Sequence, residues 1–414
     1  MIGALYDVFL CLVGIFLFPK WLSKRHKLPQ VVLKSKVIWL HAVSVGEMRA
    51  AAPLFYALRT QYPDASILIS CITTTGLEEA KRSMPHADMH FFLPWDISWI
   101  IRPLVRKLRP DLLILVEGDF WYQLVRSVKN RGGKVALVSG KISERSARRW
   151  SKVVRFSHML FSQIDIFCVQ SLCFQKRFLC MGVDPAKIKI TGNLKLDVEP
   201  CLLLSKEKET WRKRLGIADR QPVIVIGSTH DPEERLLLSA LFTFLPKVKI
   251  LIAPRHPERF EIVARTLERL GLSFTRFSEN KADAASVMLV DTMGVLSTCY
   301  QLADIAIVGG SFCYHLQGHN IFEPVSYGTP VIFGPYMKAQ LDLVDLILTA
   351  SAGESVSIDT LVPMVAAWLS SGTLLEQKKQ AARACAAAAK GATKKTLAAL
   401  NSCYEKKEKR AEGL

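Results

Sequence analysis

Residues 37–47 read VIWLHAVSVGE, and this stretch decides the fold class. A run over residues 37–42, apolar except for His41, precedes Ser44 and Glu47, a Ser-x-x-Glu pair that opens a helical pattern continuing to Thr60. An apolar strand without polar alternation is typical of a parallel sheet that helices cover on both faces. The stretch therefore predicts an α/β chain in which strands and helices alternate.

Runs of this kind recur along the chain in two rounds. The other apolar runs of the first round are 66–71, 111–116, 134–138 and 166–169, with helical stretches such as 99–108 between them. The apolar runs of the second round are 222–227, 249–253, 287–290, 305–308 and 330–333. A polar stretch over 193–200 lies between the rounds and indicates a hinge. We therefore expect two Rossmann-like domains with parallel sheets that face each other across a cleft.

The N-terminus is a separate apolar segment. Residues 2–18 are apolar except for Asp7, and the cations Lys20, Lys24, Arg25 and Lys27 follow them. A signal peptide carries its positive charge before the apolar run, so this order indicates an anchor that spans the bilayer or lies in its interface. The cations should stay in the cytoplasm with the rest of the chain. A first helix packed on the next domain is the alternative.

The expected parts follow from these patterns. They are an anchor over 1–19, an N-terminal domain over 20–197 and a C-terminal domain over 198–414 that ends in Ala-rich and charged terminal helices.

The composition narrows the class of protein without choosing a function. The chain has 414 residues, 50% of them apolar, which is enough for two domains with cores of their own. Its formal net charge of +18 fits a nucleic acid, an anionic membrane face or a phosphorylated substrate as partner. The 10 cysteines form no Cys-x-x-Cys pair, which indicates a reduced protein with mostly buried thiols.

Polar side chains follow several of the apolar runs, at the sheet edge where open parallel sheets bind ligands. Glu47 either caps its helix or accepts a proton from an attacking sugar hydroxyl. Lys195, at the hinge, is either a solvated cation or a charge that meets a departing phosphate. Arg255 comes directly after a buried run and can hold a phosphate through two parallel donors.

The stretch from Gly309 to Glu323 is another candidate. Its small residues, Gly309-Gly310-Ser311, can bind an anion through backbone N–H groups near a helix N-terminus. Glu323 is suited to accept hydrogen bonds from ribose hydroxyls, although Asn320 and Glu323 also have the spacing of a capping box.

The sequence offers little to hold a metal. His315 and His319 are four residues apart, but Gly318 argues against an uninterrupted helix that presents both to an ion. The chain contains no Asp-x-Asp triplet and no phosphate-binding Gly-x-x-x-x-Gly-Lys loop. We expect neither a metal nor another cofactor.

Taken in order, these stretches resemble those of the Kdo transferase family, the 3-deoxy-D-manno-octulosonic acid transferases of lipopolysaccharide biosynthesis. The resemblance extends from the N-terminal segment to the region after Pro335. The stretches that carry it are 41–47, 191–195 with Asp197, 228–230, 254–260, 291–294 and 318–320 with Glu323-Pro324. Each is common by itself, but their order and spacing together are specific. Members of the family have the two-domain GT-B glycosyltransferase fold.

The resemblance implies an inverting transfer of one or more Kdo residues from CMP-Kdo to lipid IVA, the tetraacyl disaccharide bisphosphate precursor of lipid A. It implies that Glu47 is the general base and that Glu117 and Lys195 help to stabilise the transition state. The residues that it assigns to CMP are Pro254, Arg255, Met293, Gly294, Val295, Asn320, Ile321, Phe322 and Glu323. It further implies that 20–197 binds the acceptor and 198–414 the donor. The protein would act on the cytoplasmic side of a bacterial inner membrane, without a nucleic-acid partner.

The sequence departs from the family pattern at three places. Val295 stands where Glu is usual, which puts one hydrogen bond to the nucleotide in question. The stretch 139–143 reads SGKIS where NARLS is more usual, and Tyr122-Gln123 replaces Pro-Asn. We expect the last two departures to alter how the acceptor is handled.

Two alternatives stay open. One is a GT-B enzyme that uses a UDP-sugar, such as a lipid A disaccharide synthase or an epimerase, which would bind UDP rather than CMP. The other is a non-catalytic, basic, membrane-bound protein that binds lipid or nucleic acid, which the charge suggests and which would bind DNA or RNA in a salt-sensitive way.

Overall fold

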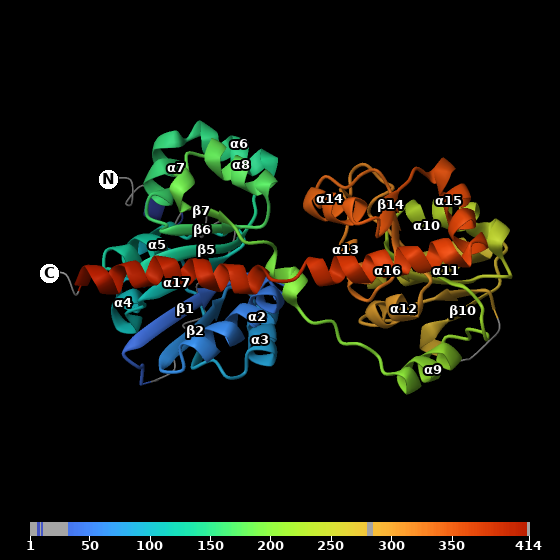
Figure 1. Ribbon diagram of the computed structural model, residues 1–414, viewed down its shortest axis with the longest axis horizontal. Coiled ribbons are helices and arrows are strands. Elements are labelled where there is room, and N and C mark those ends of the chain that lie inside the picture. The colour runs from blue at the N-terminus through green and yellow to red at the C-terminus, as the bar shows by residue number, and fades with distance from the viewer. Residues whose placement is uncertain (1–5, 9, 11–31, 280–284, 412–414) are drawn as a thin grey trace. The chain divides into compact units, whose positions relative to one another are not determined.

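The computed structural model describes residues 6–8, 10, 32–279 and 285–411. It divides into two compact units (Figure 1). The first unit comprises Met1–Val198 together with Lys390–Leu414, and the second comprises Glu199–Ala389. The assignment of all of 198–414 to one C-terminal domain is therefore wrong for its last part, because the terminal helix belongs to the first unit.

The first unit contains a seven-stranded parallel sheet with the order β3-β2-β1-β4-β5-β6-β7. Its strands are β1 (Lys36–His41), β2 (Ala65–Cys71), β3 (Met89–Phe92), β4 (Leu112–Val116), β5 (Lys134–Gly140), β6 (Ile166–Val169) and β7 (Ile188–Ile190). Its helices are α2 (Val45–Gln61), α3 (Thr74–Ser83), α4 (Ser98–Leu108), α5 (Tyr122–Lys129), α6 (Glu144–Lys152), α7 (Val154–Phe161), α8 (Leu172–Cys180) and α17 (Ala392–Ala411).

Both faces of this sheet are covered, which explains the continuous apolar runs. Trp39 of β1 packs in a core that contains side chains of α4, α5, α7 and α8. Its neighbours Ile38 and Leu40 point to the opposite face and pack in a second core with α2, α3 and α17. Because successive strand residues point to opposite faces, most positions of a doubly covered strand are apolar, and a buried polar one such as Ser70 is hydrogen-bonded.

The second unit repeats the architecture with the order β10-β11-β9-β8-β12-β13-β14, again all parallel. Its strands are β8 (Val223–Thr229), β9 (Lys249–Pro254), β10 (Phe274–Arg276), β11 (Val287–Leu289), β12 (Ile305–Val308), β13 (Val331–Phe333) and β14 (Gly353–Ser355). Its helices are α9 (Ser205–Arg214), α10 (Glu233–Leu241), α11 (Phe260–Arg269), α12 (Leu296–Leu302), α13 (Phe322–Ser326), α14 (Leu341–Thr349), α15 (Ile358–Ser370) and α16 (Gly372–Ala388). The predicted class, two α/β units with parallel sheets, is confirmed.

Ten of the expected strands are present within a few residues of their predicted bounds. The four that sequence analysis missed, β3, β7, β10 and β14, are the edge strands of the two sheets. They have three or four residues each, for example Met89–Phe92 and Ile188–Ile190. Edge strands pair on one side only and are often short, so they carry a weak apolar signal.

The terminal helix α17 returns to the first unit and lies along it (Figure 1). The carboxylate of Asp197 accepts hydrogen bonds from the backbone N–H groups of Gly391 (2.7 Å), Ala392 (3.2 Å) and Thr393. Tyr62 donates to Asn401 at 2.7 Å further along the helix. An anion at a helix N-terminus satisfies free N–H groups and favours the helix dipole, so Asp197 fixes where α17 begins.

Most of the predicted anchor over 1–19 lies outside the described residues. Of the described ones, Tyr6 and Asp7 contact the first unit, and the Tyr6 hydroxyl donates to Asp96 at 2.9 Å. Asp7 is 6% exposed and accepts from the backbone N–H of Ser98 (3.1 Å) and from Nε2 of Gln123 (2.9 Å). Asp7 therefore attaches the N-terminal segment to α4 and α5.

Among the described residues, no single helix has the length and apolar character to cross a membrane. One bent pair, Ile358–Ser370 with Gly372–Cys403, meets the criterion only jointly and turns by 101°.

Candidate active site

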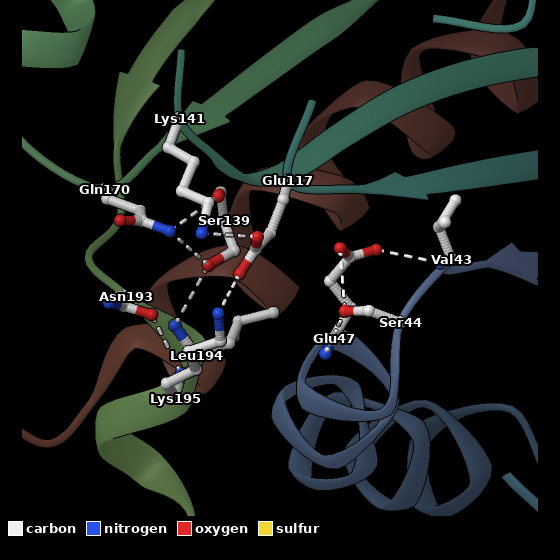
Figure 2. Close-up of polar contacts among 10 residues, drawn as sticks. All are labelled: Val43, Ser44, Glu47, Glu117, Ser139, Lys141, Gln170, Asn193, Leu194 and Lys195. Atoms are coloured by element: carbon white, nitrogen blue, oxygen red, sulfur yellow. Dashed lines mark hydrogen bonds and ion pairs between the residues drawn. The ribbon is translucent and has the colours of Figure 1, made fainter. Parts of the chain in front are cut away.

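The first candidate site lies where the strand order of the first unit reverses. β1 is the first strand of the unit, and the chain adds β2 and β3 on one side and β4 onward on the other. In open parallel sheets, ligands bind beyond the carboxyl ends of the strands at such a switch point. Glu47 follows β1 and Glu117 follows β4, so the topology brings these two predicted residues to one place (Figure 2).

Glu47 is 9% exposed and is held by the start of its own helix. Its carboxylate accepts hydrogen bonds from the backbone N–H of Val43 at 2.8 Å and from the Ser44 hydroxyl at 2.9 Å. The Ser44 hydroxyl also accepts from the backbone N–H of Glu47 at 3.3 Å, so the capping role is present. An ionised carboxylate has about four acceptor positions. The two bonds orient Glu47 and leave acceptor capacity for a ligand.

Glu117 forms the centre of a tight ion cluster, which we call the Glu117 clamp: Glu117, Lys141 and Lys195. One carboxylate oxygen lies 2.6 Å from Nζ of Lys141, and the other lies 2.5 Å from Nζ of Lys195 (Figure 2). The Glu117 side chain is 6% exposed, whereas those of Lys141 and Lys195 are 43% and 38% exposed. The buried anion therefore holds two ammonium groups whose other faces reach solvent.

The backbone at Glu117 is strained in support of this arrangement. Its φ is +66°, in the left-handed region that costs a non-glycine residue roughly 1–3 kcal/mol. Gly118 follows, and a Cβ there would lie 2.9 Å from the carbonyl oxygen of Lys141. The backbone N–H of Lys141 donates to the carbonyl of Glu117 at 3.1 Å. The ends of β4 and β5 are thus locked together so that Lys141 faces Glu117.

A second strained residue, Ser139, ties the Lys195 segment to the sheet. Ser139 has φ +51°, and its hydroxyl accepts from the backbone N–H of Leu194 at 3.3 Å. Nε2 of Gln170 donates to the same hydroxyl at 3.2 Å and to the Ser139 carbonyl at 2.9 Å (Figure 2). The Asn193 side chain then accepts from the backbone N–H of Lys195 at 3.0 Å. These bonds position Lys195 at Glu117.

The charges in this cluster shift one another's proton affinity. Burial, and then the carboxylates of Glu47 and Glu117, raise the pKa of Asp119 to about 6. Burial disfavours the ammonium of Lys141, but the Glu117 carboxylate outweighs it, so the pKa of Lys141 lies above its ordinary value. An acidic and a basic side chain with shifted pKa values at a switch point are typical of a catalytic site.

The second unit has its own switch point, between β8 and β12. Pro254 ends β9, and the backbone N–H of Arg255 donates to the carbonyl of Thr229 at the end of β8 (3.1 Å). The side chain of Arg255 is exposed. The turn before α12 contains Met293, 57% exposed, then Gly294 at φ +84° and the buried Val295.

The stretch 320–323 opens the short helix α13. The Asn320 side chain accepts from the backbone N–H of Phe322 at 3.1 Å, while Ile321 and Phe322 are buried. Burial, and next to it the charge of Glu323, raise the pKa of Tyr300 and of Tyr327. Of the four predicted nucleotide-binding residues here, Asn320 and Glu323 present polar groups near the sheet edge, whereas Ile321 and Phe322 can contribute little beyond backbone atoms.

The prediction that backbone N–H groups at Gly309-Gly310-Ser311 bind a ligand anion is wrong for Gly309 and Gly310, whose N–H groups donate to acceptors within the protein. The carboxylate of Glu233, fully buried, accepts from the backbone N–H groups of Gly310 (2.7 Å), Phe312 (2.9 Å) and His230 (3.2 Å). The backbone N–H of Gly309 donates to the carbonyl of Gly227 at 2.8 Å. An internal anion therefore already uses the donors that a ligand would need, because the loop must be held against β8.

Sequence reasoning missed several residues that build these sites. Lys141 was noted only as a departure from a family pattern, although its place after β5, next to β4, could have indicated a partner for Glu117. Gln170 lies 31 residues from Ser139, and Glu233 lies 77 and 79 residues from Gly310 and Phe312, so no local signal identified these contacts. Among the described residues, no group of three or more His, Cys, Asp or Glu side chains could hold a metal ion.

Comparison with known proteins gives consistent family matches. A family model described as 3-Deoxy-D-manno-octulosonic-acid transferase (kdotransferase) matches residues 20–198. The 3-deoxy-D-manno-octulosonic acid transferase of Chlamydophila psittaci is 33% identical over 378 residues, which cover 87% of this chain and 87% of that protein. The protein of the same name from Haemophilus influenzae is 35% identical over 304 residues, covering 72% of this chain and 70% of that protein.

Solved structures share the architecture at low identity. A glycosyltransferase from Rickettsia africae has a TM-score of 0.64 and 15% identity, covering 90% of this chain and 98% of that one. A UDP-GlcNAc 2-epimerase from Neisseria meningitidis has a TM-score of 0.63 and 14% identity, covering 89% of this chain and all of that one. At such identities these likenesses concern the fold alone, that of GT-B-like proteins.

Proposed function

Because the chain belongs to the 3-deoxy-D-manno-octulosonic acid (Kdo) transferase family, we propose that it transfers Kdo from CMP-Kdo to lipid IVA, the disaccharide bisphosphate precursor of lipid A. The observation that carries the proposal is that Glu47 and the Glu117 clamp lie at the same switch point of the first unit, where both carboxylates act on Asp119. The family resemblance assigns Glu47, Glu117 and Lys195 to catalysis. One unit then handles the acceptor and the other the nucleotide.

The proposed reaction is a direct displacement with inversion. A hydroxyl oxygen of the acceptor forms a bond to the anomeric carbon of Kdo while the bond from that carbon to the phosphate oxygen breaks. The hydroxyl proton goes to the Glu47 carboxylate, and the electron pair of the broken bond leaves with CMP. The two bonds from Val43 and Ser44 fix the direction of the Glu47 carboxylate before the acceptor arrives.

The Glu117 clamp supplies positive charge on the acceptor side. Lys141 and Lys195 each form an ion pair with one carboxylate oxygen of Glu117, and an ammonium has three donors. Both lysine side chains are partly exposed, at 43% and 38%, so donors that Glu117 does not use can reach a ligand. They are available to the phosphates of the acceptor or the carboxylate of Kdo. In the second unit, the exposed Arg255 together with Asn320 and Glu323 are proposed to hold CMP.

We further propose that the protein works at the cytoplasmic face of a bacterial inner membrane. The apolar residues 2–18, the cations after them and the net charge of +18 support this location. An acceptor that carries acyl chains would be reached there without leaving the bilayer.

The test is transfer from CMP-Kdo to lipid IVA, followed by mass analysis of the lipid. Glu47→Gln keeps a side chain that can complete the capping box but cannot take the proton. We expect its turnover to fall by roughly 100-fold or more, the usual size of general-base catalysis, with CMP binding unchanged. Glu78→Gln, at an exposed carboxylate on α3 of the same unit, is the matched control and should retain full activity. Full turnover by Glu47→Gln would remove Glu47 from the mechanism.

A nucleotide comparison tests the UDP-sugar alternative. Titration with CMP and with UDP under the same conditions should give saturable binding of CMP and much weaker binding of UDP. Preference for UDP, together with absence of a Kdo-modified lipid, would overturn the proposed donor.

A further inference from the structure

Three histidines gather at the switch point of the second unit, and none of them belongs to the residues assigned so far. His230 follows β8, His256 follows Arg255 after β9, and His319 precedes Asn320. Nε2 of His230 lies 2.7 Å from Nε2 of His319, and their rings stack with centroids 4.9 Å apart. The ring of His256 lies edge-on to His230 at 5.3 Å. The topology thus brings three histidines from separate segments of the chain into contact.

The absence of a side chain at Gly310 leaves the space that the His319 ring occupies. Gly310 has φ +70°, and a Cβ at that position would lie 2.4 Å from Cδ2 of His319. A larger residue at 310 would displace the His319 ring. The backbone of His230 is held in place, because its N–H donates to the buried carboxylate of Glu233 at 3.2 Å. The two rings are half-buried, whereas Arg255 and His256 are exposed. His256 contacts His230 edge-on, and the charges of Arg255 and His256 act on His319.

The hydrogen bond restricts the charge of the pair. A bond between two Nε2 atoms requires one nitrogen to carry a proton and the other to offer its lone pair, so the bonded pair holds at most one positive charge. Burial, followed by the charges of His230, Arg255 and His256, lowers the pKa of His319 to about 4. Burial, followed by the charge of His256, also lowers the pKa of His230, although the carboxylate of Glu234 acts in the opposite direction. Near neutral pH the bonded pair is therefore neutral when no ligand is present.

Most of the charged groups around the histidine pair already have partners, and Arg255 is the exception among the described ones. Arg259 binds Glu234 at 2.9 Å and also approaches Asp231 at 3.4 Å, so its charge is neutralised. The carboxylate of Glu233 is occupied by its three backbone donors, and burial raises the pKa of the nearby Cys313 thiol, which stays neutral. No ion pair involves Arg255 among the residues that the structure describes. Arg255 thus lies beside the neutral histidine pair as a cation without an ion-pair partner among these residues.

We propose that the His230–His319 pair and Arg255 together bind the phosphate of the nucleotide donor, and that the pair takes up one proton as the phosphate binds. A phosphate placed here would cancel the repulsion that Arg255 exerts on a charged imidazole and would favour the protonated pair. The protonated pair then donates to the phosphate and stabilises the charge that develops on it when the sugar leaves. This inference rests on the proposed nucleotide donor and adds a proton-linked phosphate site to it.

The probe for the test is the methyl ester of CMP, because its phosphodiester keeps a single charge over the range where histidine titrates. Its dissociation constant is measured by calorimetry between about pH 8 and about pH 6, in two buffers of different ionisation enthalpy. We expect binding to tighten as the pH falls, by at most about tenfold per pH unit, with net proton uptake. Cytidine, which lacks the phosphate, should bind with no such dependence.

Variants assign the effect to the pair. His319→Asn and His230→Asn should each lose both the proton uptake and the pH dependence, and should bind the ester several-fold more weakly while binding cytidine as before. His315→Asn is the matched control, because His315 is exposed in the same segment. Unchanged cytidine binding shows that the variants are folded.

The outcomes separate this inference from the proposed function. The inference is overturned if the unmodified protein binds the ester without proton uptake, or if the two variants weaken cytidine and the ester equally. Transfer of Kdo with a pH-independent ester site would leave the function standing and remove the histidine site. Proton-linked binding of the ester in a protein that transfers no Kdo would keep the histidine site and overturn the proposed function.

Discussion

The Glu117 clamp predicts a strongly non-additive response to removal of its two lysines. Glu117 is 6% exposed and has an ammonium group at each carboxylate oxygen, at 2.6 Å and 2.5 Å. Substitution of Lys141 or Lys195 alone by Met removes one cation, and the other still compensates the buried charge. Substitution of both leaves a buried carboxylate without a partner.

The magnitudes follow from the exposure of the three groups. Both lysines are more than a third exposed, at 43% and 38%, so solvent screens each pair and a single substitution should cost only about 1 kcal/mol. An uncompensated buried charge costs roughly 3–5 kcal/mol. The double variant should therefore exceed the sum of the single variants by about 1–3 kcal/mol. Glu117→Gln added to the double variant should recover much of that loss, because it removes the buried charge.

The measurement must report on the first unit alone, since a chain of two units need not unfold in one step. Hydrogen–deuterium exchange of peptides that contain β4 (Leu112–Val116) and β5 (Lys134–Gly140) gives a local free energy of opening. Lys81→Met, at an exposed lysine on α3, is the control and should leave these peptides unchanged.

Additivity would refute this reasoning. If the cost of the double variant equals the sum of the single costs within about 0.5 kcal/mol, the two lysines do not share one buried anion. Failure of Glu117→Gln to rescue the double variant would lead to the same conclusion.

Two further predictions concern the edges of the first unit. Asp197→Ala should weaken the attachment of α17 by about 1–2 kcal/mol, because it removes the acceptor for three N–H groups. Asp197→Asn should restore part of this loss. The measurement is hydrogen–deuterium exchange, which should become faster in peptides of α17 but not in peptides of α4. Asp96, which accepts from Tyr6, Gln123 and Leu124, has its pKa raised to about 6 by burial. Since its folded pKa lies above the unfolded value, the stability that it contributes is present below about pH 4 and is lost as the pH rises to about 6. Asp96→Asn should abolish this part of the pH dependence in the local free energy of opening of α5, measured by hydrogen–deuterium exchange corrected for the intrinsic rate at each pH. A profile identical to that of the unmodified protein would contradict it.

The amino-acid sequence by itself determined the fold class and placed the candidate site residues after the strands of each sheet. Largely apolar runs such as residues 37–42 predict doubly covered parallel strands, because both faces of such strands are mostly apolar. The Ser44–Glu47 pair predicts the start of α2, and the structure shows the expected cap. These features are local, so a single stretch of chain contains the whole signal.

Only the tertiary structure decided which side chains meet. Lys141 and Lys195 reach Glu117 from the ends of different segments, and the strained backbone at Glu117 and Ser139 exists because packed strands impose it. Glu233 occupies backbone donors that the sequence left open to a ligand, and α17 crosses back to the first unit to be capped by Asp197. Each of these contacts joins residues that lie far apart in the chain, and its energy depends on burial and charge pairing, which arise only when the strands assemble into sheets.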